Sequence, residues 1–296
     1  MSLAYELVKS WKTKEGNVTP TQEILDWVDK RNKTLTVDIK KIPFPKDGFW
    51  YLDETDGCIR NRKNTFFSLS GFRQTEGDQV MCEQPVIIQD EIGYLGIICK
   101  QIDGVLNFLM QAKVEPGNVN VIQISPTIQA TKSNFTQSHG GKAPAYLDFF
   151  AHSNEYRIVV DQIQSEQSSR FLGKRNRNII IVVNDDIKVL DSHKWMTLGQ
   201  IKQLMSYDNL VNMDTRTVIS CIPFSLRDFS YKELSHIRSL FKHETFFNSV
   251  FFGNSGSDIN KIYQYMNDIK MLDRSEIQLV DLKSLRSWTE KEDEIS

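Results

Sequence analysis

Apolar residues in the middle of the chain recur at period two or gather in short β-branched runs, and both patterns are typical of strands. Gly, Pro, Asn or Asp separates one run from the next. The pattern predicts strands over residues 35–44, 66–72, 83–89, 93–102, 105–114, 119–125, 156–163 and 177–185. We therefore expect a strand-rich middle.

Helical patterns are few and segregate from this middle. The sequence TPTQEILDWVDKR predicts a helix over residues 19–31, with Thr19 or Thr21 as its cap and with Ile24 and Val28 on one apolar face. Further helical patterns surround residues 143–152, 197–206 and 231–241. This segregation indicates an α+β fold with a mixed or antiparallel sheet and flanking helices, and it disfavours a parallel doubly wound sheet.

The end of the chain resembles its beginning. Residues 24–50 match residues 262–288 at an offset of 238 (262 − 24 and 288 − 50), and apolar positions agree, as with Trp27 and Tyr265. We interpret this match as the opening of a second copy of one unit, and the alternative is an ordinary C-terminal helix and strand. The tail is too apolar to be solvated, so we expect it to dock on its own domain or across a dimer. The expected division is a complete unit over residues 1–250 and a helix-strand tail over residues 251–296.

Composition narrows the classes of partner. The chain has 296 residues, 40% of them apolar, and a net charge of −2, which gives no argument for a nucleic-acid or membrane-surface partner. The start lacks an apolar signal region, and no run approaches the roughly 18 apolar residues of a membrane span. We expect a cytoplasmic protein with a small ligand. The four scattered cysteines favour reduced, packed thiols over a metal site or a disulfide framework.

A polar block interrupts the apolar runs after residue 111. Lys113 and Glu115 stand at the end of one predicted strand. The next stretch places Thr127, Gln129, Thr131 and Ser133 at period two, so strand alternation would point all four to one face. Such a face suits a hydroxyl-rich ligand. The alternative is a solvated sheet face, and Glu115 has its own alternative as a turn residue.

A second polar block follows the predicted strand over residues 156–163. Arginine in a loop rich in Ser and Gly can clamp a diphosphate, because its guanidinium is bidentate and permanently charged. The alternative is a solvated basic loop. The block contains Ser165, Glu166, Ser168, Ser169, Arg170, Lys174, Arg175 and Arg177.

Several motifs in fixed order carry a resemblance to a known family. QAKVEPGN, SPTIQATKSNF with HGG after it, SEQSSRF before KRNRN, and WMTLGQIKQLMSYDNLVNMDTRTVISC together resemble the NDP-hexose 2,3-dehydratases of deoxysugar biosynthesis, across roughly residues 27–221. One departure is Gln167, where the family usually has a second Glu. The metal-binding Glu cluster of the Nudix hydrolases is absent, so pyrophosphohydrolase activity is not implied.

The resemblance implies a fold, an assembly and a substrate class. Family members carry two Nudix-like α+β copies in one chain, act as dimers, use no metal or other cofactor for the chemistry, and take substrates of the dTDP-4-keto-6-deoxyglucose type. This chain has one complete copy and, from about residue 255, the opening of a second. The expected function is a lyase acting on a dTDP-linked 4-keto-6-deoxy sugar, as a homodimer or a heteromer with a second dehydratase copy. The alternative is a non-catalytic nucleotide-sugar-binding subunit of a split enzyme.

The expected reaction requires a base near C3, donors toward the C4 oxygen and an acid for the C2 hydroxyl. Candidates for acid or base are His139, Glu166 and Lys113. Donor or ligand contacts are expected from Lys132, Ser133, Asn134 and Phe135 in the family-like SNF motif.

Other prominent residues have structural interpretations. Trp50 is either a sugar- or base-stacking platform or a half-buried core aromatic, and the resemblance favours stacking. Trp195 is expected to pack, and Asp214 with Arg216 to form an ion pair on one strand face, because residues two apart on a strand share a face. His193 has no partner at catalytic spacing and is expected to be structural or exposed.

Overall fold

A computed structural model describes two compact units, and each is considered by itself. The described residues are 1–40, 42, 48–131, 144–223, 229–252, 258–286 and 288–289. Unit 1 comprises residues 1–39, 93–164 and 176–255. Unit 2 comprises residues 40–92, 165–175 and 256–296. The division expected from the sequence, at residue 250, rests on the repeat and stays a prediction.

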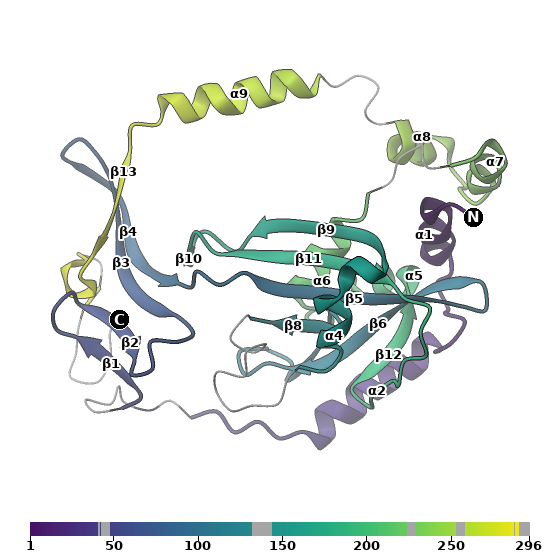
Figure 1. Cartoon of the computed structure of the whole chain (residues 1–296), viewed down its shortest axis with the longest axis horizontal. Coiled ribbons are helices and arrows are strands. Elements are labelled where there is room, and N and C mark those ends of the chain that lie inside the picture. Colours follow the sequence, from purple (N-terminus) through teal and green to yellow (C-terminus); the bar gives the residue numbers. More distant parts are fainter. Residues whose placement is uncertain are drawn as a thin grey trace. The chain divides into compact units, whose positions relative to one another are not determined.

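Unit 1 is built on a mixed sheet (Figure 1). Its strand order is β12-β6-β5-β11-β9, with β7 on β6 and β8 on β5. β11 runs parallel to β5, whereas β6 and β8 run antiparallel to β5. The strands are β5 (Gly93–Ile102), β6 (Val105–Val114), β7 (Ile122–Ser125), β8 (Ile128–Ala130), β9 (Arg157–Ser165), β11 (Arg175–Val182) and β12 (His193–Thr197).

Both faces of the central strands of this sheet are buried. Alternate residues of β5 and β6, such as Ile97 and Phe108, join one apolar cluster with helices α1, α2, α5 and α6, while Ile98 and Leu109 join a second cluster with Phe150 of α4. Central strands of such a sheet have few positions for polar side chains, which explains their long apolar runs. The helices are α1 (Leu3–Lys12), α2 (Thr21–Thr34), α4 (Leu147–Ala151), α5 (Leu198–Leu204) and α6 (Met213–Ser220).

The central strands part at one position. β5 and β6 pair from Ile102 with Val105 up to Ile98 with Leu109; beyond this rung β5 pairs with β8, and β6 pairs with β7. Thr127, in the link between β7 and β8, lies at the split. Its hydroxyl accepts the amide of Ile98 at 2.9 Å and donates to the carbonyl of Leu109. One buried hydroxyl thus satisfies a donor and an acceptor at the split.

A third cluster joins α1 to two later helices of unit 1. α7 (Tyr231–Ser239) begins with a capping box between Ser230 and Glu233, and α8 (Glu244–Phe252) follows it. Phe247 and Phe251 pack with Val8 and Ile237.

Unit 2 contains a second sheet, ordered β1-β2-β3-β4-β10, with β13 on β3. Neighbouring strands run antiparallel except β10, which is parallel to β4. The strands are β1 (Trp50–Asp53), β2 (Cys58–Asn61), β3 (Ser68–Glu76), β4 (Gln79–Ile88), β10 (Phe171–Leu172) and β13 (Glu276–Val280).

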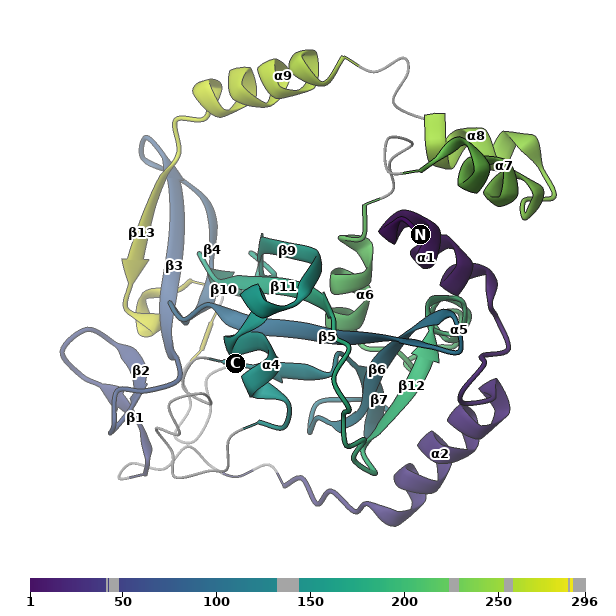
Figure 2. The same cartoon turned by 45° about the vertical axis from the view of Figure 1, so that its right-hand side comes forward.

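The C-terminal tail docks on unit 2 of its own chain through β13 (Figure 2). The tail comes so close that a Cβ on Gly71 would lie 2.6 Å from the carbonyl oxygen of Val280, and one on Gly57 1.9 Å from a carboxylate oxygen of Asp281. After β13, a 3-10 turn, η3 (Leu282–Ser284), leads to Leu285, and Leu282 and Leu285 are 3% and 2% exposed. The expected docking is confirmed for this part.

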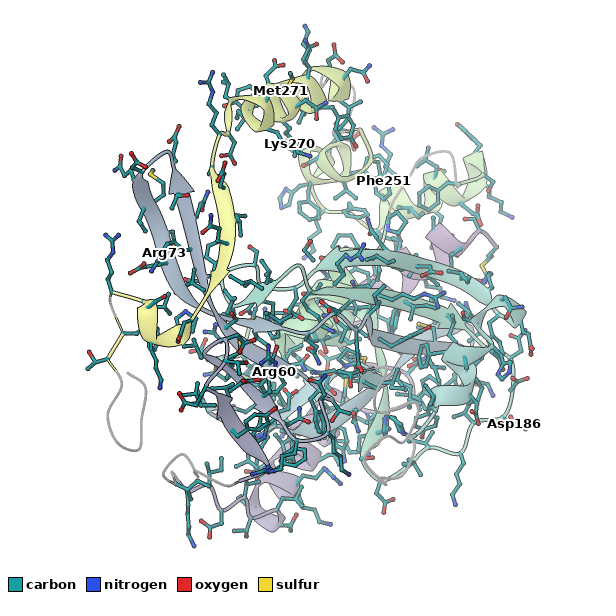
Figure 3. The ribbon with its side chains drawn as sticks, turned by 60° about the vertical axis from the view of Figure 1, so that its left-hand side comes forward. Arg60, Arg73, Asp186, Phe251, Lys270 and Met271 are labelled. Atoms are coloured by element: carbon teal, nitrogen blue, oxygen red, sulfur yellow. The ribbon has the colours of Figure 1, made fainter. Side chains whose placement is uncertain are left out.

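The helix of the tail, α9 (Ile259–Leu272), has the bounds of α2 shifted by 238 residues (259 − 21 and 272 − 34). No residue of α9 is buried, and Figure 3 labels Lys270 and Met271 on it. Ile262, which corresponds to the buried Ile24 of α2, is 48% exposed. The repeat interpretation thus agrees with the helix lengths, whereas the expected docking does not extend to α9.

Most predicted strands are present, and the α+β class with mixed sheets and flanking helices is confirmed. The predicted strand over residues 35–44 is wrong in its described part, which forms no strand. An alternating pattern forms a strand only where the edge of another strand is available for pairing. The corresponding residues of the tail have such an edge and pair with β3, as β13. The predicted cap of α2 is also wrong, because Pro20 occupies the cap position without a side-chain hydrogen bond.

The interpretation of Asp214 and Arg216 as strand neighbours is wrong. Asn212 caps α6 here, so the two residues lie on a helix, where positions two apart do not share a face. Arg216 donates instead to the backbone carbonyls of Val211 and Met205.

Within the described part of the chain, no helix is long and apolar enough to cross a membrane.

We predict that Leu282→Ala lowers the free energy of unfolding of unit 2 by about 2–5 kcal/mol, the usual cost of truncating a buried leucine. Leu279→Ala is the matched control, because Leu279 lies in the same tail but is 51% exposed, and it should change stability by about 0.5 kcal/mol or less. Hydrogen exchange of the β3 and β13 amides under urea measures both. Equal effects of the two substitutions would show that the tail does not dock as described.

We also predict that Thr127→Val destabilises unit 1, because it leaves the Ile98 amide and the Leu109 carbonyl without their partner, at about 1–3 kcal/mol for each group. Thr127→Ser keeps the hydroxyl and should retain most of the stability. Urea unfolding of both variants is the measurement. A valine variant as stable as the serine variant would contradict the bridging role.

Candidate active site

A chain of polar side chains crosses unit 1 near the sheet split. Lys113 of β6 pairs with Glu115, one residue beyond the strand, with Nζ 3.0 Å from Oε1. Gln129 of β8 donates from Nε2 to the same Oε1 at 2.9 Å. Asn212, the cap of α6, donates from Nδ2 to the Gln129 Oε1 at 3.2 Å. Side chains of β6 and β8 therefore meet at one carboxylate, and the cap of α6 contacts it only through Gln129.

The sheet explains why these residues meet. Lys113 lies on the part of β6 that pairs with β7, and Gln129 lies on β8, whose register sets it opposite Leu95. Ile128 and Ala130 are buried, so alternation directs the side chain of Gln129 to the other side of its short strand. The side chains of Lys113 and Glu115 remain 25% and 30% exposed. The ion pair is therefore held in place and remains partly exposed.

Thr127 does not belong to this accessible group. It is 2% exposed, and its hydroxyl bonds to the backbone of β5 and β6. The expected ligand role of Thr127 is corrected to a structural one. Thr127 lies in the link between β7 and β8, where strand alternation does not hold. His193 supports the same link, since its Nε2 lies 3.1 Å from the Thr127 carbonyl oxygen, and burial lowers the pKa of this histidine.

The remainder of the first polar block is only partly described. Thr131 is half-buried just after β8. Five predicted site residues lie outside the described residues: Lys132, Ser133, Asn134, Phe135 and His139. The expected common face of Gln129, Thr131 and Ser133 therefore stays a prediction.

The second polar block lies mainly in unit 2. The Arg170 carbonyl accepts the Ile87 amide at 2.7 Å, and Glu166 donates its amide to the Lys174 carbonyl at 2.8 Å. Lys174 is 5% exposed, donates to the Glu91 carbonyl, and has a pKa lowered by burial. Exposed side chains of this block belong to Ser165, Ser168, Ser169, Arg170 and Arg175, whereas Glu166 is half-buried.

Arg177 has a different environment from the rest of that block. In unit 1 its guanidinium binds both carboxylate oxygens of Asp161, at 2.7 and 2.6 Å, and also contacts the Tyr94 hydroxyl at 3.2 Å. The hydrogen bonds from Arg177 hold the pKa of Asp161 below its usual value. A diphosphate would have to displace this bidentate partner, so the exposed Arg170 and Arg175 are better suited to the expected clamp.

Trp50 packs among aromatic residues of unit 2. Its ring lies 4.8 Å from the Phe67 ring and 5.9 Å from the Phe49 ring, measured between centroids, and the residue is half-buried. These contacts agree with the core interpretation, and a stacking role stays a prediction. So does the expectation that Trp50 lines one site with Gln129 and the second polar block, because those residues belong to both units.

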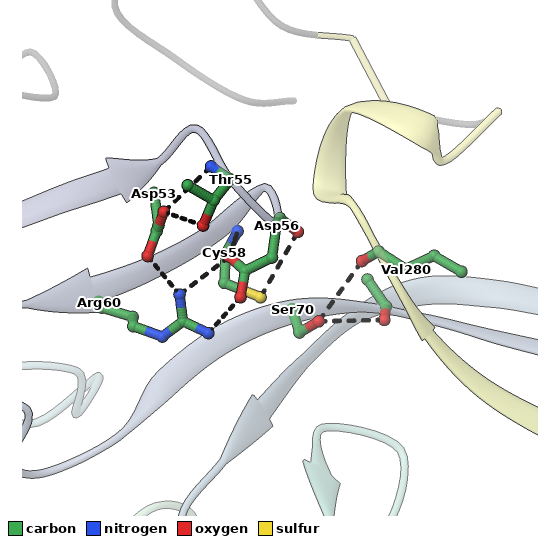
Figure 4. A network of polar contacts seen from close by, with 8 residues as sticks. Asp53, Thr55, Asp56, Cys58, Arg60, Ser70 and Val280 are labelled. Carbon is green, nitrogen blue, oxygen red and sulfur yellow. Dashed lines mark hydrogen bonds and ion pairs between the residues drawn. The ribbon is translucent and has the colours of Figure 1, made fainter.

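An arginine network in unit 2 was not singled out in the sequence (Figure 4). Arg60 of β2 binds Asp53 at 2.8 Å and Asp56 at 2.9 Å, and a second contact to Asp56 makes that pair bidentate. The hydrogen bond from Arg60 lowers the pKa of Asp56 to about 2. The contacts of Arg60 join the two ends of the β1–β2 turn, so Arg60 stabilises the hairpin beside the docked tail.

Asn212 is the member of the unit 1 network that the sequence reasoning missed. An Asn directly before a helical segment is a cap signal, which could have found the residue but not its contact with Gln129.

Among the described residues, no three His, Cys, Asp or Glu side chains form a group that could hold a metal ion.

The family model described as NDP-hexose 2,3-dehydratase matches residues 21–222, which include Lys113, Glu115, Gln129 and Asn212. A solved structure, that of the C. elegans Ap4A hydrolase, aligns at a TM-score of 0.28 and 13% identity, covering 44% of this chain and 93% of that one. This likeness is too low to carry an argument, and the Nudix-like part of the expected fold rests on the family resemblance.

Three relatives are called dTDP-4-dehydro-6-deoxy-alpha-D-glucopyranose 2,3-dehydratase. The Saccharopolyspora spinosa protein is 39% identical over 283 residues, 95% of this chain and 58% of the relative. The Amycolatopsis orientalis protein is 40% identical over 75% of this chain and 48% of the relative, and the Streptomyces violaceoruber protein is 42% identical over 70% and 47%. The chain spans about half the length of the curated relatives it matches. By the family match and these identities, the chain belongs to the NDP-hexose 2,3-dehydratase family.

Proposed function

We propose that this chain catalyses the C2–C3 dehydration of a dTDP-linked 4-keto-6-deoxyhexose. The family match over residues 21–222 and the names of the relatives support the reaction class. The observation that carries the proposal is the partly exposed Lys113–Glu115 ion pair, which lies inside the matched region and is hydrogen-bonded by Gln129.

The reaction assigns distinct tasks to the two charged residues. The C3 hydrogen of a 4-keto sugar is acidic because it is α to the carbonyl, and we propose that the Glu115 carboxylate accepts it. Negative charge then develops on the C4 oxygen, and the Lys113 ammonium would donate a hydrogen bond to it.

Completion of the elimination needs a proton for the leaving group. The electrons of the enolate form the C2–C3 double bond while the C2 hydroxyl departs, and an acid protonates it so that it leaves as water. The resulting enol tautomerises to the 3,4-diketone, so no electrons are gained or lost overall. His139 and Glu166 stay the sequence-based candidates for the acid, with Lys132, Ser133 and Asn134 as further donors.

Recognition of the dTDP group is proposed to use the exposed cations of unit 2. Arg170 and Arg175 are exposed, and both can bind a phosphate bidentately. Trp50 is proposed as a stacking surface for the base or the sugar. We further propose a cytoplasmic protein that acts as a homodimer, or as a heteromer with a second dehydratase copy.

Binding without turnover is the second candidate function. The exposed Arg170 and Arg175 favour it, because both can bind a phosphate without taking part in a catalytic step. A dTDP-sugar-binding unit would keep its affinity for the substrate and form no diketone.

The test is to incubate the chain with dTDP-4-keto-6-deoxyglucose, a 3-ketoreductase and NADPH, and to follow the reduced 2-deoxy product by mass. We predict product with the wild-type chain, and a kcat about 10²- to 10⁴-fold lower with Glu115→Gln, the range for loss of a general base. Substrate affinity should change little, because glutamine preserves the shape of the side chain.

Asp186→Asn is the matched control, since it removes another carboxylate bound to a lysine of the same sheet; Asp186 is labelled in Figure 3. Its Oδ1 lies 3.2 Å from Lys100 Nζ. Its kcat should match the wild type. Equal activity of Glu115→Gln and Asp186→Asn would remove Glu115 as the base. Bound substrate without product in the wild type would favour the binding function.

A further inference from the structure

The amide of Asn212 is positioned to orient the proposed base through one intermediate residue. Asn212 is 5% exposed, and it contacts Gln129, which contacts Glu115. We propose that Asn212 is a positioning residue that fixes the side-chain amide of Gln129 and, through it, the carboxylate of Glu115. This inference rests on the proposed function for its kinetic consequence.

Hydrogen-bond polarity fixes the direction of the chain. The Oδ1 atom of Asn212 accepts the Thr215 amide at 2.8 Å, as an N-cap must, so only its Nδ2 is available to face Gln129. Gln129 therefore presents Oε1 to Asn212 and is left with Nε2 for Glu115. The helix cap thereby determines that Glu115 meets a donor rather than an acceptor.

Asn212 is itself held rigidly. Its backbone amide donates to the Ile124 carbonyl of β7 at 3.0 Å, and the Thr215 hydroxyl donates to the same carbonyl at 3.2 Å. Ile124 in turn donates its amide to the Leu210 carbonyl at 2.8 Å. Rotation of the Asn212 side chain would break both the cap and the contact to Gln129.

Glu115 needs such support because it lies outside regular structure. It follows the last residue of β6 and begins a turn, in which its carbonyl accepts the Asn118 amide at 3.0 Å. Lys113 and Gln129 both donate to Oε1, which leaves Oε2 as the oxygen that these two donors do not occupy. The network thus sets which oxygen can accept a proton from a substrate.

Two substitutions at residue 212 separate positioning from capping. Serine and aspartate are both good N-caps, so the helix should start as before in Asn212→Ser and Asn212→Asp. Serine removes the donor to Gln129. Aspartate places an acceptor opposite the Gln129 Oε1, so the Gln129 amide should turn over and present its oxygen to Glu115.

For Asn212→Ser we expect kcat to fall about 10-fold and for Asn212→Asp about 100-fold, the scale of a lost or reversed hydrogen bond to a charged group. The KM should stay within about twofold, and the acid limb of the pH–rate profile should move to higher pH for the aspartate variant. Ser230→Ala, which removes the cap of α7 in the same unit, should leave kcat unchanged.

A double-mutant cycle with Gln129→Met tests whether Asn212 acts through Gln129. Asn212→Ser should lower kcat no further in the Gln129→Met background, because the side chain that links Asn212 to Glu115 is already lost. Additive losses would overturn the proposal, since they would mean that Asn212 acts by another route.

A readout without substrate keeps this inference distinct from the proposed function. In protein labelled with ¹⁵N-glutamine, the side-chain signal of Gln129, identified by its loss in Gln129→Met, should shift as Glu115 titrates, and Glu115→Gln should abolish that shift. Asn212→Ser should move the signal and weaken its response. An unchanged signal in Asn212→Ser overturns the positioning role, whereas lack of turnover in the wild type overturns only the proposed function.

Discussion

The hydroxyl of Thr127 bonds to both central strands at the rung where β5 and β6 part, accepting from Ile98 and donating to Leu109. Because the central strands are buried on both faces, an unpaired backbone amide or carbonyl at the split would be costly. With both groups satisfied, the two strands can separate and take β7 and β8 as new neighbours. The polar residues of the network then lie on the strand segments that follow the split.

This arrangement explains why a polar block interrupts so apolar a chain. The segment supplies one hydroxyl to the buried split and, two residues later, the amide that binds Glu115. α6 contributes next, because its cap residue Asn212 serves the helix with one atom and Gln129 with another. The same side chains thus cap α6 and orient the Glu115 carboxylate. In this way a partly exposed carboxylate is held in one orientation.

Local pattern was a good guide wherever the environment is regular. The runs that became β5, β6 and β11 were readable, because burial on both faces demands continuous apolar residues. The region 35–44 misled because alternation does not reveal whether a partner edge exists. The NMDTR segment misled because a capping Asn outweighs local strand propensity.

The site was only partly predictable for a related reason. Lys113 and Glu115 could be chosen from their place at a strand end, but their contact with Gln129 depends on a split in the sheet that no local pattern encodes. Thr127 was assigned to the ligand because strand alternation was extended across a link between two short strands. The match between residues 24–50 and 262–288, by contrast, was visible in the sequence. The equal lengths of α2 and α9 agree with a repeat, which stays a prediction.

The central claim is that Glu115 removes the C3 proton, and the most direct measurement is release of deuterium from substrate labelled at C3. The account predicts that the wild-type chain transfers the label from C3 of dTDP-4-keto-6-deoxyglucose to solvent water in step with product formation. Glu115→Gln should release it at least about 100-fold more slowly while still binding the substrate. Label release by Glu115→Gln at the wild-type rate would contradict the account, because another group would then be the base.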